Sequence, residues 1–193
     1  MLGRKIVSSL LSTSLCCLTA STASAADTKW SRQGDKVSGN VVVRTATDLT
    51  KLKGVRVIEG DLDIQSIDSV DLKPLAGLTS IKGKLVVSYT KVESLHGLES
   101  LGCVEGAVLV MRNQKLKSVA ALKNLKTVYG NLTILDNPLL SSLPAAGIRI
   151  GEPVKKTVGS LIITGNRALS SAEVKKFAER CTINGRVTTR DNG

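Results

Sequence analysis

The chain has 193 residues, a length that fits one domain with a buried core of its own. Hydrophobic residues make up 42% of the chain but aromatic residues only 2%, so Val, Ile and Leu must fill the core, and a nucleic-acid surface that stacks bases on aromatic rings is disfavoured. The formal net charge of +11 favours anionic partners without naming one.

The first 25 residues predict a signal peptide. Arg4 and Lys5 give a positively charged start, an apolar stretch follows, and small residues precede Ala26. A retained membrane anchor is disfavoured because Ser and Thr interrupt the apolar stretch, and no second apolar span follows that could serve as an anchor after cleavage. We therefore expect export to a periplasm or outside the cell, with residues 26–38 as a lead-in segment.

A five-residue motif recurs along the rest of the chain: Gly, any residue, an aliphatic residue, any residue, a second aliphatic residue. The two aliphatic residues are two positions apart, so they share one face of a strand. The spacings between successive glycines are 21, 23, 23, 24, 29 and 26, which is typical of a solenoid with atypical end repeats. The copies begin at Gly39, Gly60, Gly83, Gly106, Gly130, Gly159 and Gly185.

A second set of aliphatic residues precedes each glycine in steps of three, as at Leu75, Leu78 and Ile81. Only about ten residues separate one motif from the next, which favours a bend and a second short strand over a helix. The sequence therefore predicts a mostly β, right-handed parallel β-solenoid over residues 39–193, built as one domain.

An asparagine recurs seven residues after the glycine of three copies, at Asn113, Asn137 and Asn166. Aligned asparagines can bond to the backbone of a tight bend and to the same bend in the neighbouring coil. We interpret these residues as a structural ladder rather than as a ligand site.

The C-terminal part departs from the repeat. Ser170 and Glu173 have the spacing of a capping box, and Val174 and Phe177 fall on one face of a short helix predicted at residues 171–180. Because the ends of a solenoid expose strand edges, we expect this helix to cover one end of the core.

The run from Leu125 to Pro138 resembles the receptor L domain, the leucine-rich-repeat-like solenoid of growth-factor receptor ectodomains, and the resemblance extends over roughly Val41 to Asn166. It implies a right-handed coil of parallel sheets that binds protein ligands on a sheet face, without enzymatic activity. The cysteine-rich modules and transmembrane helix of the receptors have no counterpart here, so the chain is most similar to exported bacterial proteins of this type.

Residues for catalysis or metal binding do not converge in the sequence, and we expect no enzyme, no cofactor and no metal site. The chain has one histidine, His96, which lies in a predicted turn. Asp61, Asp63, Asp68 and Asp71 form a dense acidic group, which raises the alternative of a polysaccharide lyase on a parallel β-helix. The neighbouring coils do not repeat these carboxylates, so a solvated or salt-bridged patch is the preferred interpretation.

Two cysteines remain after the predicted signal peptide, Cys103 and Cys181. Their distances from the nearest motif glycine place them three coils apart, about 14 Å at roughly 4.8 Å per coil. A disulfide needs Cα atoms within about 7 Å, so we expect two separate thiols and no disulfide.

The middle residue of each predicted strand points outward, and several of these residues are aliphatic. An exposed strand face is ordinarily polar, so we predict a ligand-binding face there. Strand propensity alone, or cover by the N-terminal segment, would explain the same residues. The predicted contacts are Val86, Leu109, Met111, Leu135 and Ile162.

Together these patterns predict an exported, non-catalytic binding module that presents a parallel sheet face to a protein or cell-envelope ligand, without nucleic acid as a partner. The alternative is a passive envelope or matrix component that its basic charge holds on anionic polymers.

Overall fold

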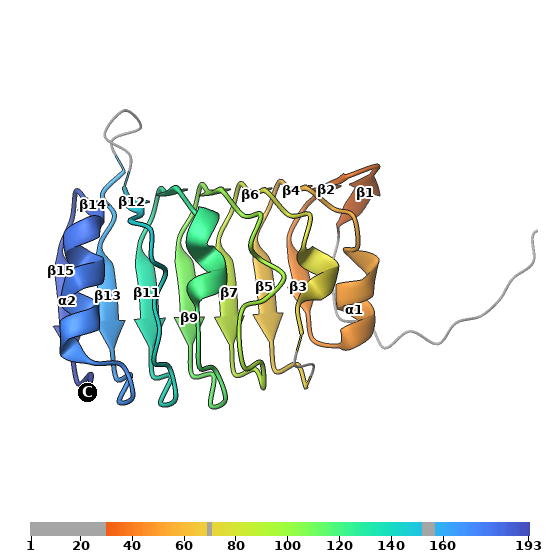
Figure 1. Ribbon diagram of the computed structural model, residues 1–193. Helices are drawn as coiled ribbons and strands as arrows, with labels where there is room; N and C mark the ends of the chain where they lie inside the picture. The colour runs from red at the N-terminus through yellow and green to blue at the C-terminus, as the bar shows by residue number, and fades with distance from the viewer. Residues whose placement is uncertain (1–29, 69–70, 152–156) are drawn as a thin grey trace, which may run out of the picture.

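The computed structural model describes residues 30–68, 71–151 and 157–193. The predicted signal peptide, residues 1–25, lies outside these ranges. The described chain winds into a stack of coils, and successive coils place their strands side by side in a long sheet and a short sheet (Figure 1). The mostly β, parallel solenoid predicted from the glycine spacing is confirmed.

The long sheet has seven strands within the described residues, and every neighbouring pair is parallel. Each strand is one copy of the glycine motif, and equivalent residues of successive copies lie side by side. The strands are β3 (Val41–Val43), β5 (Leu62–Gln65), β7 (Leu85–Ser88), β9 (Val108–Met111), β11 (Leu132–Leu135), β13 (Leu161–Thr164) and β15 (Val187–Arg190).

The short sheet forms a second wall of the coil. Its first two strands make an antiparallel hairpin, and β2 then pairs in parallel with β4, so the segment predicted as a lead-in already supplies a strand of the solenoid. The strands are β1 (Ser31–Gln33), β2 (Lys36–Ser38), β4 (Val57–Ile58), β6 (Ser80–Ile81), β8 (Cys103–Val104), β10 (Thr127–Val128), β12 (Arg149–Ile150) and β14 (Thr182–Ile183).

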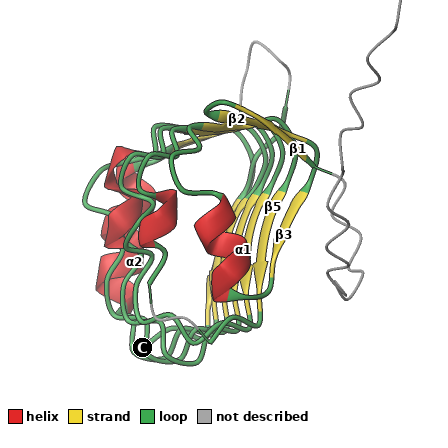
Figure 2. Cartoon of the chain, turned by 90° about the vertical axis from the view of Figure 1, so that its right-hand side faces the viewer, coloured by secondary structure: helices red, strands yellow, loops and turns green. Residues whose placement is uncertain are grey.

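Short helices occupy the side of the coil opposite the long sheet: the 3-10 turns η1 (Lys73–Leu75) and η2 (Ala120–Asn124), and helix α2 (Ser171–Arg180) (Figure 2). Helix α1 (Ala46–Lys51) instead lies at the N-terminal end, where its residue Leu49 is buried in the core. The repeat pattern of the sequence does not predict α1.

Helix α2 has the bounds that the sequence predicts, but a different position. Ser170 caps it by accepting a hydrogen bond from the Glu173 amide at 3.2 Å, whereas the Glu173 carboxylate pairs with Arg180 instead of closing the predicted capping box. The helix runs along the side of the last coil rather than across its end (Figures 1 and 2). Val187, which faces inward from β15, consequently remains 51% exposed.

The motif glycines stand in a column where the backbones of successive coils touch. The amide of Gly83 donates to the Gly60 carbonyl at 3.0 Å, and the amide of Gly106 donates to the Gly83 carbonyl at 3.0 Å. A Cβ atom on Gly106 would lie 2.7 Å from the Gly83 carbonyl carbon, far inside van der Waals contact. The spacing between coils therefore requires glycine at this position.

Replacement of Gly106 by Ala is expected to lower the free energy of unfolding by about 1–3 kcal/mol, because the methyl group forces two backbones apart. Urea unfolding followed by circular dichroism measures the change. Gly102→Ala is the matched control, since its nearest neighbour, the Thr79 carbonyl oxygen, would lie 3.7 Å from the new Cβ atom. Equal destabilisation by both substitutions would contradict the role of the column.

The predicted asparagine ladder is confirmed. The Asn113 side-chain amide donates to the Asn137 Oδ1 atom at 3.1 Å, and the Asn137 amide donates to Asn166 Oδ1 at 3.2 Å. The structure adds two rungs that were not predicted. The Thr90 hydroxyl donates to Asn113 Oδ1 at 2.7 Å, and Asn192 Oδ1 accepts from the Asn166 side-chain amide at 3.2 Å. The ladder ties the turns of successive coils together inside the core.

The residue before each rung adopts a left-handed backbone conformation. Four of these positions carry side chains other than glycine in the coils that hold the ladder: Tyr89, Arg112, Asp136 and Asp191, with φ values of 53 to 55°. Such angles are uncommon for residues with a Cβ atom. The sharp turn that ends each strand of the long sheet imposes them, and it directs the side chains onto the outer edge of the coil.

Candidate ligand-binding face

The outward side chains of the long sheet form what we call the outer face. The second residue of every strand is half-buried rather than fully exposed, because side chains on neighbouring strands shield one another. This row consists of Val42, Asp63, Val86, Leu109, Thr133, Ile162 and Thr188.

An apolar band crosses the middle of the outer face. Val86 lies beside Leu109 on the neighbouring strand, and Met111 lies beside Leu135. Ile162, on β13, is the fifth member, and Thr133 separates it from Leu109. The structure thus brings the five predicted contacts onto one face, but not into an unbroken row.

Charged residues of opposite sign flank the apolar band. On one side, Asp61 and Asp63 lie at the start of β5 and within it. On the other side, Arg186 and Arg190 lie at the start and the end of β15. The outer face is therefore mixed in charge toward its second strand, where Arg44 and Lys84 of the neighbouring coils lie near the two carboxylates. It is apolar in the middle and basic at its last strand.

The carboxylate of Asp63 is held among half-buried neighbours. Its Oδ2 atom accepts a hydrogen bond from Gln65, whereas its Oδ1 atom is buried and has no hydrogen-bond partner within the described part of the chain. Burial raises the pKa of the Asp63 carboxyl above its usual range, although the Gln65 hydrogen bond and the charge of Arg44 act in the opposite direction.

Replacement of Asp63 by Asn is expected to stabilise the protein at neutral pH. A raised native pKa means that the native state binds the proton more tightly than the unfolded chain, so ionisation of Asp63 destabilises the fold at pH values above that pKa. The gain in the free energy of unfolding that Asp63→Asn gives over the wild type should become smaller as the pH falls through the raised pKa.

Urea unfolding at pH 7 and at about pH 3 measures this difference for the wild type and the variant. Asp68→Asn, at an exposed position, is the control for the change in net charge. An advantage of Asp63→Asn that is equal at both pH values would contradict the assignment.

A cluster of polar side chains lies on the turns next to the outer face. The Arg112 guanidinium donates to the Tyr89 hydroxyl, lies 5.7 Å from the Tyr89 ring centroid and pairs with Asp136 at 3.6 Å. These residues, with Lys91 and Lys115, line a cavity of about 470 Å³. Because Tyr89 is 55% exposed, it offers an aromatic surface at the rim of the outer face.

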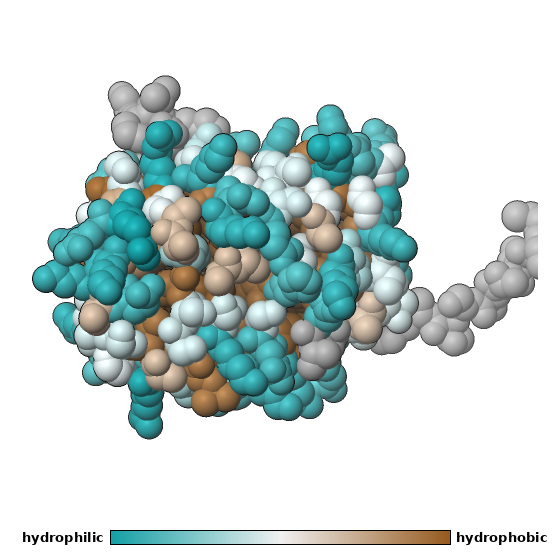
Figure 3. All heavy atoms as spheres, in the orientation of Figure 1, coloured by the Kyte–Doolittle hydropathy of each residue, from teal (hydrophilic) through white to brown (hydrophobic). Residues whose placement is uncertain are grey.

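The surface that carries the helices differs from the outer face in how its polar and apolar residues are distributed. Hydrophilic residues cover most of this surface, and hydrophobic residues show between them toward its centre (Figure 3). The described part of the chain contains no helix with the length and apolarity needed to cross a membrane.

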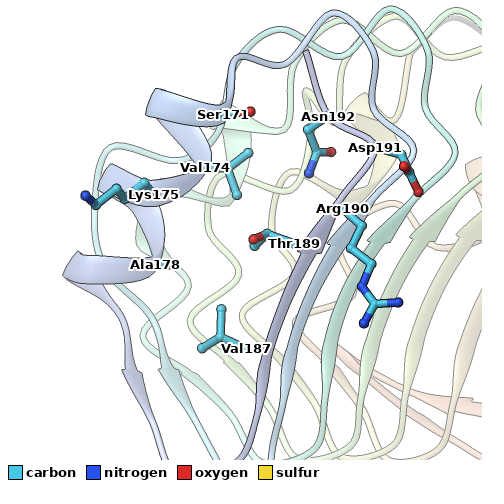
Figure 4. A pocket seen from close by; sticks show the side chains of 9 residues that line it. All are labelled: Ser171, Val174, Lys175, Ala178, Val187, Thr189, Arg190, Asp191 and Asn192. Atoms are coloured by element: carbon cyan, nitrogen blue, oxygen red, sulfur yellow. The ribbon is translucent and has the colours of Figure 1, made fainter.

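A second cavity, of about 330 Å³, lies between α2 and β15. Val187 and Thr189 point toward Val174 and Ala178 of the helix, whereas Arg190 points away from the helix toward the outer face (Figure 4). The cavity exists because α2 leaves the inward side of the last strand partly uncovered.

The acidic residues that raised the lyase alternative do not converge. Asp68 pairs with Lys91 at 2.7 Å, and Asp71 pairs with Lys73 at 2.6 Å, so each carboxylate has a separate basic partner. No cluster of three His, Cys, Asp or Glu side chains suited to a metal ion occurs among the residues that the structure describes. His96 pairs with Glu99 at an exposed turn.

The two cysteines lie at different levels of the short sheet. Cys103 is in β8 and Cys181 directly precedes β14, and strands β10 and β12 lie between them. Neither forms a disulfide bond within the described part of the chain. Burial raises the pKa of the Cys181 thiol, which therefore stays protonated over a wider pH range.

Comparison with known proteins gives one family. The model of the family described as Receptor L domain matches residues 79–182, more than half of the chain. No curated protein and no solved structure gives a significant match. The matched segment includes β7 to β13 and hence the whole apolar band.

Proposed function

This chain belongs to the receptor L domain family, whose members are ligand-binding domains rather than enzymes, and on that premise we propose that it is an exported, non-catalytic binding module. Its binding surface is the outer face of the long sheet. Its ligand is a protein or a cell-envelope component.

The apolar band carries this proposal. Val86, Leu109, Met111, Leu135 and Ile162 lie outside the coil, where side chains contribute little to the core. Aliphatic and Met side chains gathered on a strand face, with charged residues at both sides, have the make-up of a protein interface with an apolar centre and a polar rim. The band favours a protein ligand over a carbohydrate polymer.

The rigidity of the long sheet supports the same function. The backbone hydrogen bonds between strands, together with the buried asparagine ladder, hold the outward side chains in a fixed pattern. A pre-organised surface loses less conformational entropy when a ligand binds, which raises affinity for a given set of contacts.

The double substitution Val86→Lys and Leu109→Lys tests the proposal. Two ammonium groups at the centre of the band would have to be desolvated on binding, so capture of the ligand from a cell-envelope extract should be lost. Affinity capture followed by mass spectrometry compares the variant with the wild type, and circular dichroism checks that both are folded.

The double substitution Val158→Lys and Leu139→Lys is the matched control. It makes the same chemical changes at exposed hydrophobic residues that lie outside the strands of the long sheet. Capture that survives substitution within the band, or that is lost equally in the control, would exclude the outer face as the binding surface.

A second candidate function is a passive envelope component held on anionic polymers, which the net charge of +11 favours. Attachment through exposed charges is screened within about 10 Å at 0.1 M salt. In that case about 0.5 M NaCl alone should release the native protein from envelope fractions, as judged by immunoblotting. Retention in salt, with release after Val86→Lys and Leu109→Lys, would instead favour the outer face.

A further inference from the structure

The outer face is complementary to itself. We propose that a second copy of this chain packs against it, with the two long sheets face to face and related by a twofold axis that runs parallel to the strands between β9 and β11. This inference rests on the proposed function, because it identifies one protein partner of the same face.

The geometry follows from the strand order. A twofold axis parallel to the strands keeps the direction of each strand but reverses the order of the stack. With the axis between β9 and β11, β9 of one copy faces β11 of the other, β7 faces β13, and β5 faces β15. Equivalent positions along the strands then meet across the interface.

Apolar side chains meet one another in this arrangement. Val86 faces Ile162 of the second copy, and Met111 faces Leu135. Twofold symmetry makes each contact twice, whereas Leu109 faces Thr133, so the two apolar bands cover each other except at this position. The half-buried side chains of both bands leave water together, which is the main driving force for association.

Polar side chains meet partners of the opposite character. Asp61 faces Arg186 of the second copy, because each directly precedes its strand. Asp63 faces Thr188, whose neutral side chain sets no like charge against the carboxylate. Asp61 and Arg186 thus form the opposite-charge pair of the interface, which twofold symmetry makes twice.

Neighbouring arrangements are unfavourable. An axis through β9 brings β3 onto β15 and sets Arg44 against Arg190, while an axis through β11 brings β7 onto β15 and sets Lys84 against Arg186. A twofold axis that lies between the two sheets but runs perpendicular to the strands sets Asp63 of one copy against Asp63 of the other. Like charges that face each other oppose binding, so the charges select the arrangement between β9 and β11.

The area is sufficient for a dimer of moderate affinity. Strands about 4.8 Å apart and about 3.3 Å per residue give an overlap on the order of 500 Å² per copy for the strands that meet. The total, about 1,000 Å², is at the lower limit for specific interfaces. A ligand of the outer face would compete with the second copy.

Sedimentation equilibrium of the purified protein tests the proposal. The wild type should reach twice the mass of one chain at micromolar concentration. Arg186→Glu should raise the dimer dissociation constant at least about tenfold, since it turns two attractive contacts into repulsive ones. Arg149→Glu, the same change on β12 of the short sheet, should leave the constant unchanged.

Asp61→Asn added to Arg186→Glu should recover most of the lost affinity. Asn at this position removes the negative charge that the new Glu side chain at position 186 would repel. It also keeps an oxygen acceptor for the Lys84 backbone amide, which donates to Asp61 Oδ1 at 2.7 Å in the wild type. As an independent measurement, Val86→Cys with Ile162→Cys should give disulfide-linked dimers on mild oxidation, and Val86→Cys alone should not.

A wild type that stays monomeric at about 100 μM would overturn this inference, as would equal effects of Arg186→Glu and Arg149→Glu. Failure of Asp61→Asn to recover affinity would overturn the assigned contact. The dimer and the proposed function can fail independently. A monomer that captures an envelope ligand would contradict only the dimer, whereas a dimer that captures nothing would contradict only the envelope ligand.

Discussion

The close approach of backbones at the glycine column is the constraint on which the structure depends. At Gly83 and Gly106 the chain has no room for a side chain, and each amide there bonds directly to the preceding coil. This contact fixes the distance between coils and, through it, the alignment of every strand in the long sheet. Stacked aliphatic residues then fill the interior, so that residues such as Val87 and Val110 are completely buried.

The same constraint generates the outer face. Because equivalent residues of successive coils lie side by side, any bias at one position of the repeat becomes a continuous feature of the surface. Aliphatic residues at outward positions of the middle coils therefore become a band, and charges at the outer coils become two flanks. The order of charged and apolar residues on such a surface contributes to the choice of partner, in addition to the area that is buried on binding.

Much of this architecture could be predicted from the sequence, because the glycine spacing and the paired aliphatic residues reflect local requirements of each coil. The five predicted contacts of the outer face follow from strand alternation alone. Other features depend on neighbours. Helix α1 is only six residues long, and its signal, a Thr45 and Asp48 capping box, is easily overlooked beside the repeat.

The unexpected features arise where coils differ from one another. Thr90, for example, takes the place of an asparagine in the ladder. Asn192 is an exception, because its spacing from Gly185 follows the rule that identified the other rungs. The position of α2 depends on the path of the last coil, which no local pattern encodes. The burial of one Asp63 oxygen depends on packing between strands, so only the three-dimensional arrangement reveals it.

The left-handed turns at Tyr89, Arg112 and Asp136 have a consequence for how this protein tolerates change. Glycine would relieve local strain of about 1 kcal/mol at each of these sites, and the chain does use glycine at the corresponding Gly165. Three consecutive coils nevertheless retain an aromatic ring, a guanidinium and a carboxylate there, in contact with one another. Glycine at these positions would therefore exchange backbone strain for a larger loss of chain entropy on folding, and it would remove the contacts that give the rim its chemical identity.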